Sequence, residues 1–287
     1  MRKLQSAMEY LMTYGWAILA IAIVMVSLYS LGIFNAGSLK PTATPGSCQV
    51  MKTAAQTSLA GQCSNLIPKY VGQFGPGTSA SISSPSSALA LTAFTVSLWI
   101  KVVGPDVNGQ YMLEKGTSNA NQNYNLILAS NGAYEFEPSD NLGTQHTVLN
   151  IKPSSGNYND SRWHSIVITC VSNGNAYLYI DGVQVQSNSV SFTIFSGSQQ
   201  LILAQGANGE TIYVANVQIY NASLDNATAK ALYLEGIGGV PVDPNHLAGW
   251  WPLNGNANDY SGNNNQGAAS KAIWNANWQS GYSAPTS

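Results

Sequence analysis

Residues 162–185, RWHSIVITCVSNGNAYLYIDGVQV, contain the pattern that decides the fold. Two short runs rich in β-branched and aromatic residues, Ser165–Val171 and Ala176–Ile180, flank the dipeptide Asn173-Gly174. Asp181-Gly182 then turns the chain again. Asn-Gly and Asp-Gly favour the type I′ turns whose twist matches that of an antiparallel hairpin. The stretch therefore predicts antiparallel strands joined by tight turns.

The same pattern recurs on both sides of this stretch. Strand-like runs flank Asn-Gly at residues 131–132 and at 208–209, and Phe94–Ile100 alternates apolar with other side chains. Outside the N-terminal region one helix is expected, Asn226–Glu235, with Asp225 as its N-cap. Many short strands with tight turns and no helices between them predict a mainly β protein, built as an antiparallel β-sandwich.

The composition is unusual because few residues are charged. Asp, Glu, Lys and Arg make up only 8% of the 287 residues, against about 25% in an average globular protein. The formal net charge is −2. Nucleic acid is therefore excluded as an expected partner, since it requires a basic face. Hydrophobic residues at 45% are enough for a packed core and argue against disorder.

The N-terminal region contains a long apolar segment. Arg2 and Lys3 are the only basic residues before Lys40, and no charged residue occurs from Tyr10 to Leu39. This run exceeds the ~20 apolar residues that a helix needs to cross a bilayer. Positive charge before the run predicts an N-terminus inside the cell and the bulk of the chain outside. An ordinary secretory signal fits less well, because its apolar run is about 7–15 residues long.

Residues 5–24, QSAMEYLMTYGWAILAIAIV, resemble the class III signal peptide of archaeal type IV pilin-like proteins. The resemblance implies that a prepilin peptidase cuts between Leu4 and Gln5 and that the following helix becomes the filament core. It also implies that Glu9 pairs with the N-terminal amine of a neighbouring subunit, since a carboxylate beside an apolar helix is costly unless it is paired. The alternative places Glu9 in the headgroup region. Leu4 departs from the family pattern, which has a small residue before the cut.

The chain accordingly divides into a leader (1–4), a hydrophobic transmembrane or filament-core helix (5–34), a linker (35–47) and a β-sandwich (48–287). The linker, NAGSLKPTATPGS, is rich in residues typical of a semi-extended spacer. Cys48 and Cys63 follow it, and an extracellular disulfide between them would contribute roughly 3 kcal/mol. Two free thiols are the alternative. Cys170 lies in an apolar run and is expected in the core.

Four segments together resemble the laminin G-like, concanavalin A-like jelly roll: FTVSLWIK (94–101), RWHSIVIT (162–169), AYLYIDGVQV (176–185) and VANVQIYNASLDNATAKALY (214–233). The resemblance covers roughly residues 66–235 and implies a jelly-roll sandwich. Residues 247–268, LAGWWPLNGNANDYSGNNNQGA, resemble the segment that usually opens such a domain, yet they stand near the C-terminus. Residues 247–287 therefore close the same sandwich as a permuted segment, begin a truncated second copy, or insert into a neighbouring subunit as an exchanged strand.

Catalysis is not expected, although concanavalin A-like folds include glycoside hydrolases. Such enzymes need two carboxylates about 5–9.5 Å apart. Glu135 and Glu137, two apart on one strand face, are the best pair, but Pro138 follows them directly and would end the strand. The three histidines are scattered and no nucleophile motif accompanies them: His146, His164 and His246.

No cofactor or metal site is expected from the sequence. The jelly-roll resemblance allows calcium as an alternative, and four loop residues offer oxygen ligands: Asp106, Asn108, Asp181 and Asp259. Loop Asp and Asn residues more often form turns.

Two further features bear on binding at the cell surface. Four tryptophans gather late in the chain: Trp250, Trp251, Trp274 and Trp278. As an exposed row they would form a stacking platform for sugars, whereas core packing is the alternative. Three N-x-S/T sequons predict a glycoprotein if the domain lies outside the cell: Asn159, Asn221 and Asn226.

The sequence thus favours a structural subunit of an archaeal type IV pilin-like filament at the cell surface, which displays a glycan- or surface-binding adhesive domain. Its expected partners are identical or related subunits, the prepilin peptidase, the membrane before assembly, and a carbohydrate or surface ligand. A lectin-like adhesin that keeps the helix as a single membrane anchor and does not polymerise is the alternative. A surface glycoside hydrolase is the third interpretation.

Overall fold

The computed structural model describes residues 14–27, 42–64, 66–83, 85–104, 110–116, 119–153, 157–206 and 209–286. The chain divides into two compact units, Met1–Pro41 and Thr42–Ser287. In the first unit a helix covers 14–27. Within the described ranges, no helix has both the length and the apolar character needed to cross a membrane. The other parts of the helix expected over 5–34 lie outside the described residues.

The larger unit is built around an eight-stranded sheet in which all neighbouring strands are antiparallel. Its order is β14-β13-β12-β7-β16-β5-β19, and β17 pairs with the second half of β16. The strands are β5 (Val71–Phe74), β7 (Ala93–Val103), β12 (His164–Val171), β13 (Asn175–Ile180), β14 (Val183–Ser189), β16 (Thr211–Tyr220), β17 (Leu247–Trp251) and β19 (Ile273–Asn275).

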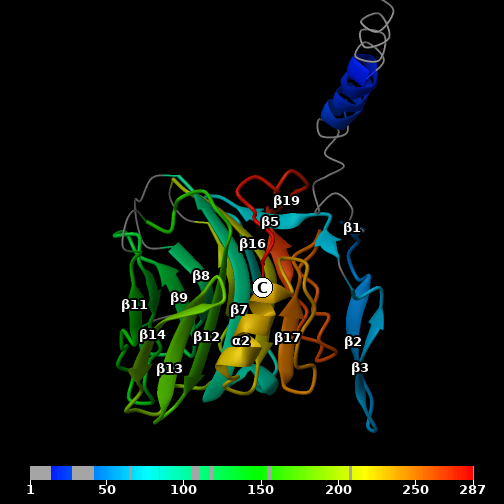
Figure 1. Cartoon of the computed structure of the whole chain (residues 1–287). Helices are drawn as coiled ribbons and strands as arrows, with labels where there is room; N and C mark the ends of the chain where they lie inside the picture. Colours follow the sequence, from blue (N-terminus) through cyan, green and yellow to red (C-terminus); the bar gives the residue numbers. More distant parts are fainter. Residues whose placement is uncertain are drawn as a thin grey trace, which may run out of the picture. The chain divides into compact units, whose positions relative to one another are not determined.

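A seven-stranded antiparallel sheet packs against the first, with the order β11-β10-β9-β8-β15-β6-β18 (Figure 1). Its strands are β6 (Ser79–Ile82), β8 (Gln110–Lys115), β9 (Asn125–Leu128), β10 (Tyr134–Phe136), β11 (Leu149–Ile151), β15 (Leu201–Gln205) and β18 (Ala268–Ser270). Apolar side chains from both sheets form one buried cluster between them. The mainly β, antiparallel sandwich expected from the sequence is confirmed.

Smaller elements surround the two sheets. Strands β1 (Thr42–Ala43) and β4 (Ile67–Pro68) form a parallel pair, and β2 (Cys48–Lys52) and β3 (Thr57–Gly61) form a hairpin. A 3₁₀ turn, η2, covers Ser87–Leu89, and helix α2 covers Asn226–Leu234.

Strand β12 shows how alternation in the sequence places side chains on both faces of the eight-stranded sheet. Ile166, Ile168 and Cys170 point into the cluster between the sheets. Val167 points to the opposite face, where it packs with Leu232 of α2. Because successive residues of a strand face opposite sides, a continuous apolar run such as this one is buried on both faces. The eight-stranded sheet is therefore covered by the second sheet on one side and by α2 on the other.

The turns follow the chemistry of their residues. Asn173 and Asp181 adopt left-handed backbone conformations, with φ of 55° and 51°. Asn and Asp tolerate this region better than other residues with a side chain. These two turns place β12, β13 and β14 side by side in the sheet. Helix α2 begins where Asp225 accepts a hydrogen bond from the Thr228 amide at 2.8 Å, which satisfies one free amide of the first turn.

The C-terminal segment 247–287 takes part in the sandwich of its own chain. Strand β17 pairs with β16, β18 with the edge of β6, and β19 with the edge of β5. Its strands, orange and red in Figure 1, therefore extend both sheets. Trp251 at the end of β17 is fully buried in the cluster between the sheets. In the structure this segment supplies part of the core, as a permuted segment would.

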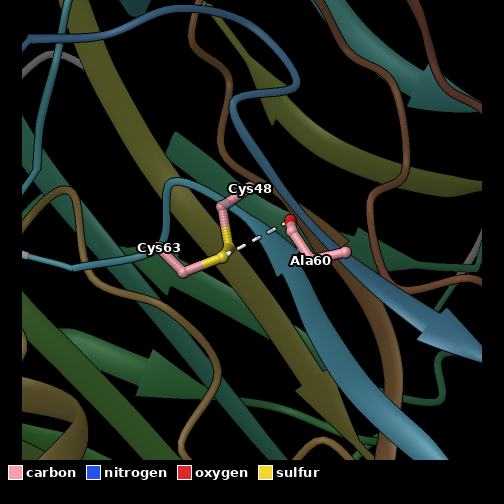
Figure 2. Close-up of a disulfide and its surroundings, with 3 residues drawn as sticks. All are labelled: Cys48, Ala60 and Cys63. Atoms are coloured by element: carbon pink, nitrogen blue, oxygen red, sulfur yellow. Dashed lines mark hydrogen bonds between the residues drawn. A yellow bond between two sulfur atoms is a disulfide. The ribbon is translucent and has the colours of Figure 1, made fainter.

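Cys48 at the start of β2 and Cys63 just after β3 form a disulfide (Figure 2). The Cys63 sulfur also lies 3.5 Å from the Ala60 carbonyl oxygen. The disulfide joins the two ends of the β2–β3 hairpin. This hairpin lies near the beginning of the larger unit, shortly after β1. Cys170 is a free thiol buried between the sheets, and burial raises its pKa to about 12, so it is not a reactive group at neutral pH.

Candidate functional site

A polar pocket with a volume of about 170 Å³ lies on the α2 side of the eight-stranded sheet. We call it the His164 pocket. It is lined by residues of β7, β12, the turn after β13, α2 and the C-terminal tail: Trp99, Arg162, Trp163, His164, Asp181, Tyr233, Gly281 and Ser283. Sheet, helix and tail therefore meet at this one site.

His164 stands at the centre of the polar wall. Its Nδ1 lies 2.8 Å from Asp181 Oδ2, and its Nε2 lies 3.3 Å from Asp160 Oδ1. Burial by itself would lower the pKa of His164, but the hydrogen bond and charge of Asp181, together with Asp160, raise it above its ordinary value. An imidazole with a carboxylate at each nitrogen can donate to both only when it is protonated. The geometry therefore favours a positively charged His164.

Asp181 is fixed by its position in the turn. Its Oδ1 accepts the Ser165 amide at 2.8 Å, while its Oδ2 meets His164. The side chain is still 39% exposed, so it keeps acceptor capacity toward solvent. Burial, followed by the nearby charge of Asp181, raises the pKa of the Tyr233 hydroxyl.

Aromatic rings form the apolar wall of the pocket. The rings of Trp99 and Tyr233 stack with centroids 5.9 Å apart. Tyr233 also packs over Gly182, where a Cβ would lie 2.5 Å from the tyrosine ring. Any side chain at this position would therefore push Tyr233 away from Asp181, so the second residue of the Asp-Gly turn shapes the pocket as well as the hairpin.

The C-terminal tail forms the third wall and is held by several bonds. The Trp163 indole donates to the Trp278 carbonyl at 2.9 Å, and the Trp163 amide donates to the Gly281 carbonyl at 3.0 Å. Lys101 donates to the Ser280 carbonyl at 3.0 Å, and burial lowers the pKa of this lysine. These contacts fix the tail beside β12, so the pocket has a defined wall on that side.

The late tryptophans do not form the exposed stacking platform considered from the sequence, and the structure contradicts that interpretation. Trp250, Trp251 and Trp278 are no more than 3% exposed and belong to three separate clusters, and Trp274 is half-buried at the edge of the core. Adjacent residues of β17 face opposite sides of the sheet, which separates Trp250 from Trp251. Their indoles donate to Asn216 Oδ1 and to the Asn265 carbonyl, respectively, so their polar atoms are already used inside the domain.

The pocket tryptophans are instead Trp99 and Trp163, which sequence reasoning did not select. Both stand in the strand segments that carry the jelly-roll resemblance, FTVSLWIK and RWHSIVIT. Because side chains alternate along β7, Trp99 points away from the core between the sheets, and this alternation in the sequence could have identified it. The contribution of the tail could not be predicted in this way, because Gly281 and Ser283 lie about 120 residues after Trp163 in the sequence.

Of the four residues considered for calcium, only Asp181 and Asp259 lie in the part of the chain that the structure describes. Asp106 and Asn108 lie outside the described residues. Asp259 accepts the amides of Trp250, Ser261 and Asn265, so its carboxylate organises a turn. Among the residues that the structure describes, no group of three His, Cys, Asp or Glu side chains could hold a metal ion.

The carboxylates considered for hydrolysis are engaged by neutral neighbours. Glu135 Oε1 accepts from Asn150 at 2.7 Å, and Glu137 accepts from Thr147 and Gln145 at 2.7 and 3.2 Å. Burial, followed by the charge of Glu137, raises the pKa of Glu135. The pair thus stands in a polar network on the outer face of the seven-stranded sheet, and the expectation of a non-enzymatic protein stays a prediction.

The remaining candidates from the sequence have different structural settings. Leu4, Gln5 and Glu9, the processing and assembly residues, lie outside the described residues. Asn221 and Asn226 are exposed on either side of the turn that leads into α2. Asn159 is half-buried and its amide donates to the Gly104 carbonyl at 3.3 Å. The three sequons therefore differ in how freely a glycan could be attached.

A family model described as the concanavalin A-like lectin/glucanases superfamily matches residues 76–230. The match covers more than half of the 287 residues, and the chain belongs to this superfamily. The matched region contains strands β6 to β16 and ends within α2, whereas β5, β17, β18 and β19 of the two sheets lie outside it. A search of curated proteins found no match.

Solved structures with a similar fold include binding domains of clostridial toxins. The binding domain of botulinum neurotoxin DC in complex with rat synaptotagmin II is 17% identical, with a TM-score of 0.43 over 50% of this chain and 36% of that chain. The binding domain of Paraclostridial Mosquitocidal Protein 1 is 15% identical, with a TM-score of 0.45 over 68% and 47%. The botulinum neurotoxin DC binding domain in complex with SialylT is 14% identical, with a TM-score of 0.48 over 65% and 50%. This chain spans half of their length or less, and likenesses of this size carry no argument about function.

Proposed function

We propose that the protein is a structural subunit of a type IV pilin-like filament at the cell surface of an archaeon, and that its β-sandwich is the displayed binding domain. The observation that carries the proposal is the N-terminal sequence, in which Gln5 and Glu9 precede a charge-free run from Tyr10 to Leu39. In pilin-like proteins such a segment inserts in the membrane and is then assembled into the filament core. The lectin superfamily of the sandwich supports the binding role.

Two features of the larger unit support a location outside the cell. The Cys48–Cys63 disulfide is typical of oxidising compartments, since the cytosol keeps thiols reduced. The low content of charged residues, 8%, suits a subunit whose neighbours are copies of itself, because few charges must then be desolvated or paired between subunits. Residues 35–47 would give the sandwich its distance from the filament core.

The N-terminus of the mature chain tests the proposal directly. Material sheared from cells that express the protein should contain filaments under the electron microscope, and mass spectrometry of that material should give a chain that begins at Gln5. A Glu9→Gln variant should be cleaved but should not enter filaments, because it loses the charge expected to pair with a neighbouring N-terminus. Glu235→Gln is the matched control: it removes an exposed carboxylate from the sandwich, and it should assemble normally. An intact Met1 in surface material would refute the filament role.

A lectin-like adhesin anchored by a single helix is the second candidate. The length of the charge-free run favours it as well, because such a run suffices for a permanent membrane anchor. This candidate predicts an uncleaved chain that remains with the membrane after shearing, and a Glu9→Gln variant with unchanged surface display.

A further inference from the structure

We propose that Lys52 and Asn263 form an intramolecular isopeptide bond, which joins the first hairpin of the β-sandwich covalently to the C-terminal segment. Lys52 ends β2, and Asn263 lies in the loop between β17 and β18. Lys52 Nζ lies 3.1 Å from Asn263 Oδ1, although the two residues are 211 positions apart in the sequence. The Val50 amide donates to the Tyr260 carbonyl at 2.8 Å, which also holds β2 against this loop. The bond goes beyond the filament role and does not depend on it.

The Lys52 side chain is held with its amine against the amide group. Nζ donates to the Leu247 carbonyl at 2.7 Å as well as to Asn263. Gly262 lies over the side-chain stem, since a Cβ on this glycine would lie 3.3 Å from Lys52 Cγ. Burial lowers the pKa of Lys52, and the charge of Asp259 opposes this effect only in part. The neutral, nucleophilic form of the amine is therefore more populated than for a lysine in solvent.

The carboxamide group of Asn263 is fixed beside this amine. Its Nδ2 donates to the Leu247 and Ala248 carbonyls, each at 2.9 Å, and lies 3.2 Å from Ser261 Oγ. Its Oδ1 faces Lys52, so the carbonyl carbon is one bond away from the atom that Nζ contacts. Groups held in a reacting geometry within one molecule reach effective molarities of about 10⁵–10⁸ M.

Asp259 is a positioning residue for the loop that carries Asn263. It is 7% exposed, and its Oδ1 accepts the Ser261 amide at 2.9 Å while its Oδ2 accepts the Asn265 amide at 2.8 Å. These two amides lie on either side of Asn263 in the sequence. The loop therefore holds its shape without a contribution from Lys52, and it presents the carboxamide to β2.

The reaction balances without a further reactant. Lys52 first loses one proton from its ammonium group to solvent. The neutral Nζ then attacks Cγ of Asn263, so that the Nζ–Cγ bond forms and the Cγ–Nδ2 bond breaks. One hydrogen of the amine remains on the new amide, and the other leaves with Nδ2 as ammonia, which solvent protonates. The reaction takes place once in each chain, so a slow step is sufficient.

The cross-link would fix the place where the chain enters the β-sandwich. Cys48 and Lys52 are the first and last residues of β2, so both ends of this strand would carry a covalent bond. Residues 247–287 supply strands to both sheets. The hairpin could then not separate from this segment even when the hydrogen bonds between them break.

Mass spectrometry of the full-length chain, denatured and reduced after incubation in alkaline buffer, tests the inference. The mass should be lower by one molecule of ammonia than the value calculated for the N-terminus that the chain has. Trypsin should not cut after Lys52, and one branched peptide should contain both Lys52 and Asn263. A chain that keeps the calculated mass would overturn the inference.

Three variants assign the missing ammonia to this pair. Lys52→Arg keeps the positive charge, and Asn263→Ala removes the carboxamide; neither can form the bond, so both should have the full calculated mass. Lys69→Arg is the matched control, since it makes the same exchange at an exposed lysine, and it should keep the deficit. Asn-Gly steps can also lose ammonia, by closing a succinimide ring. A deficit that persists in Lys52→Arg would therefore belong to such a step and would refute the isopeptide bond.

Discussion

Replacing Trp251 with alanine tests whether the C-terminal segment is part of the core of its own chain. The indole is fully buried between the two sheets and donates to the Asn265 carbonyl at 2.9 Å. If residues 247–287 instead packed into a neighbouring subunit in solution, the Trp251 side chain would not lie in the core of its own chain. Its removal would then lower the stability of an isolated chain much less. The substitution therefore distinguishes a permuted segment from an exchanged one.

The expected loss can be worked out from the burial. A core aromatic side chain removes about 150–250 Å² from water, which at about 25 cal/mol per Å² corresponds to roughly 4–6 kcal/mol. Measured Trp→Ala costs in protein cores are about 3–5 kcal/mol, and the two ranges overlap. For a domain of this size, each kcal/mol lowers Tm by about 2–4 °C, so the expected decrease is about 6–20 °C.

The measurement is calorimetry of the purified full-length chain under conditions in which it is monomeric. Trp274→Ala is the matched control, since it removes the same side chain from a half-buried position in the same segment. Its Tm should fall by a few degrees at most, because less apolar area is lost. A Trp251→Ala chain that melts with or above the Trp274→Ala chain would refute the reasoning and would favour strand exchange between subunits.

Three other measurements follow from the described residues. Replacing Cys48 and Cys63 with serine should destabilise the hairpin by roughly 3 kcal/mol, visible as faster hydrogen exchange or proteolysis in residues 48–63, and unchanged protection there would contradict a role for the bond. Because the folded pKa of His164 is raised, its contribution to stability is complete below about pH 6.5 and is lost as pH rises through the folded value. The Tm difference between the natural chain and His164→Gln should therefore be largest in acid, and a difference that grows toward pH 9 would show the sign to be wrong. Mass spectrometry of glycopeptides should find glycans at Asn221 and Asn226 and not at the half-buried third sequon, and the reverse pattern would contradict the surface geometry.

Local chemistry made the strands and turns predictable. The Asn173-Gly174 and Asp181-Gly182 turns are where the sequence places them, and strands β12 and β13 begin one residue earlier than their apolar runs suggested. Helix α2 begins at Asn226 with Asp225 as its N-cap, as expected. These features depend on residues within a few positions of one another, so the sequence contains all the information that they require.

The fate of the late tryptophans could not be read from their sequence alone. Because aromatic side chains supply much of the core of a sandwich, core packing was the stronger of the two interpretations, but a row of indoles is compatible with an exposed platform as well. Only the pairing of β17 with β16, and of the tail with β12, decides that Trp250, Trp251 and Trp278 enter three different clusters. The correct choice depends on contacts between segments far apart in the chain.

The sequence by itself determined that the protein is a mainly β, antiparallel sandwich, because alternation, turn residues and the helix N-cap act over short distances. The concanavalin A-like type was implied only by the resemblance of four segments to that family. It also supplied the charge-free N-terminal run on which the proposed filament role depends. The tertiary structure decided that the C-terminal segment completes both sheets and that Trp99, His164, Tyr233 and Ser283 meet at one pocket. In the sequence His164 lies more than 60 residues after Trp99, and Tyr233 lies more than 60 residues after His164. Ser283 follows in the C-terminal tail. Only the packing of sheet, helix and tail around a common core brings such residues together.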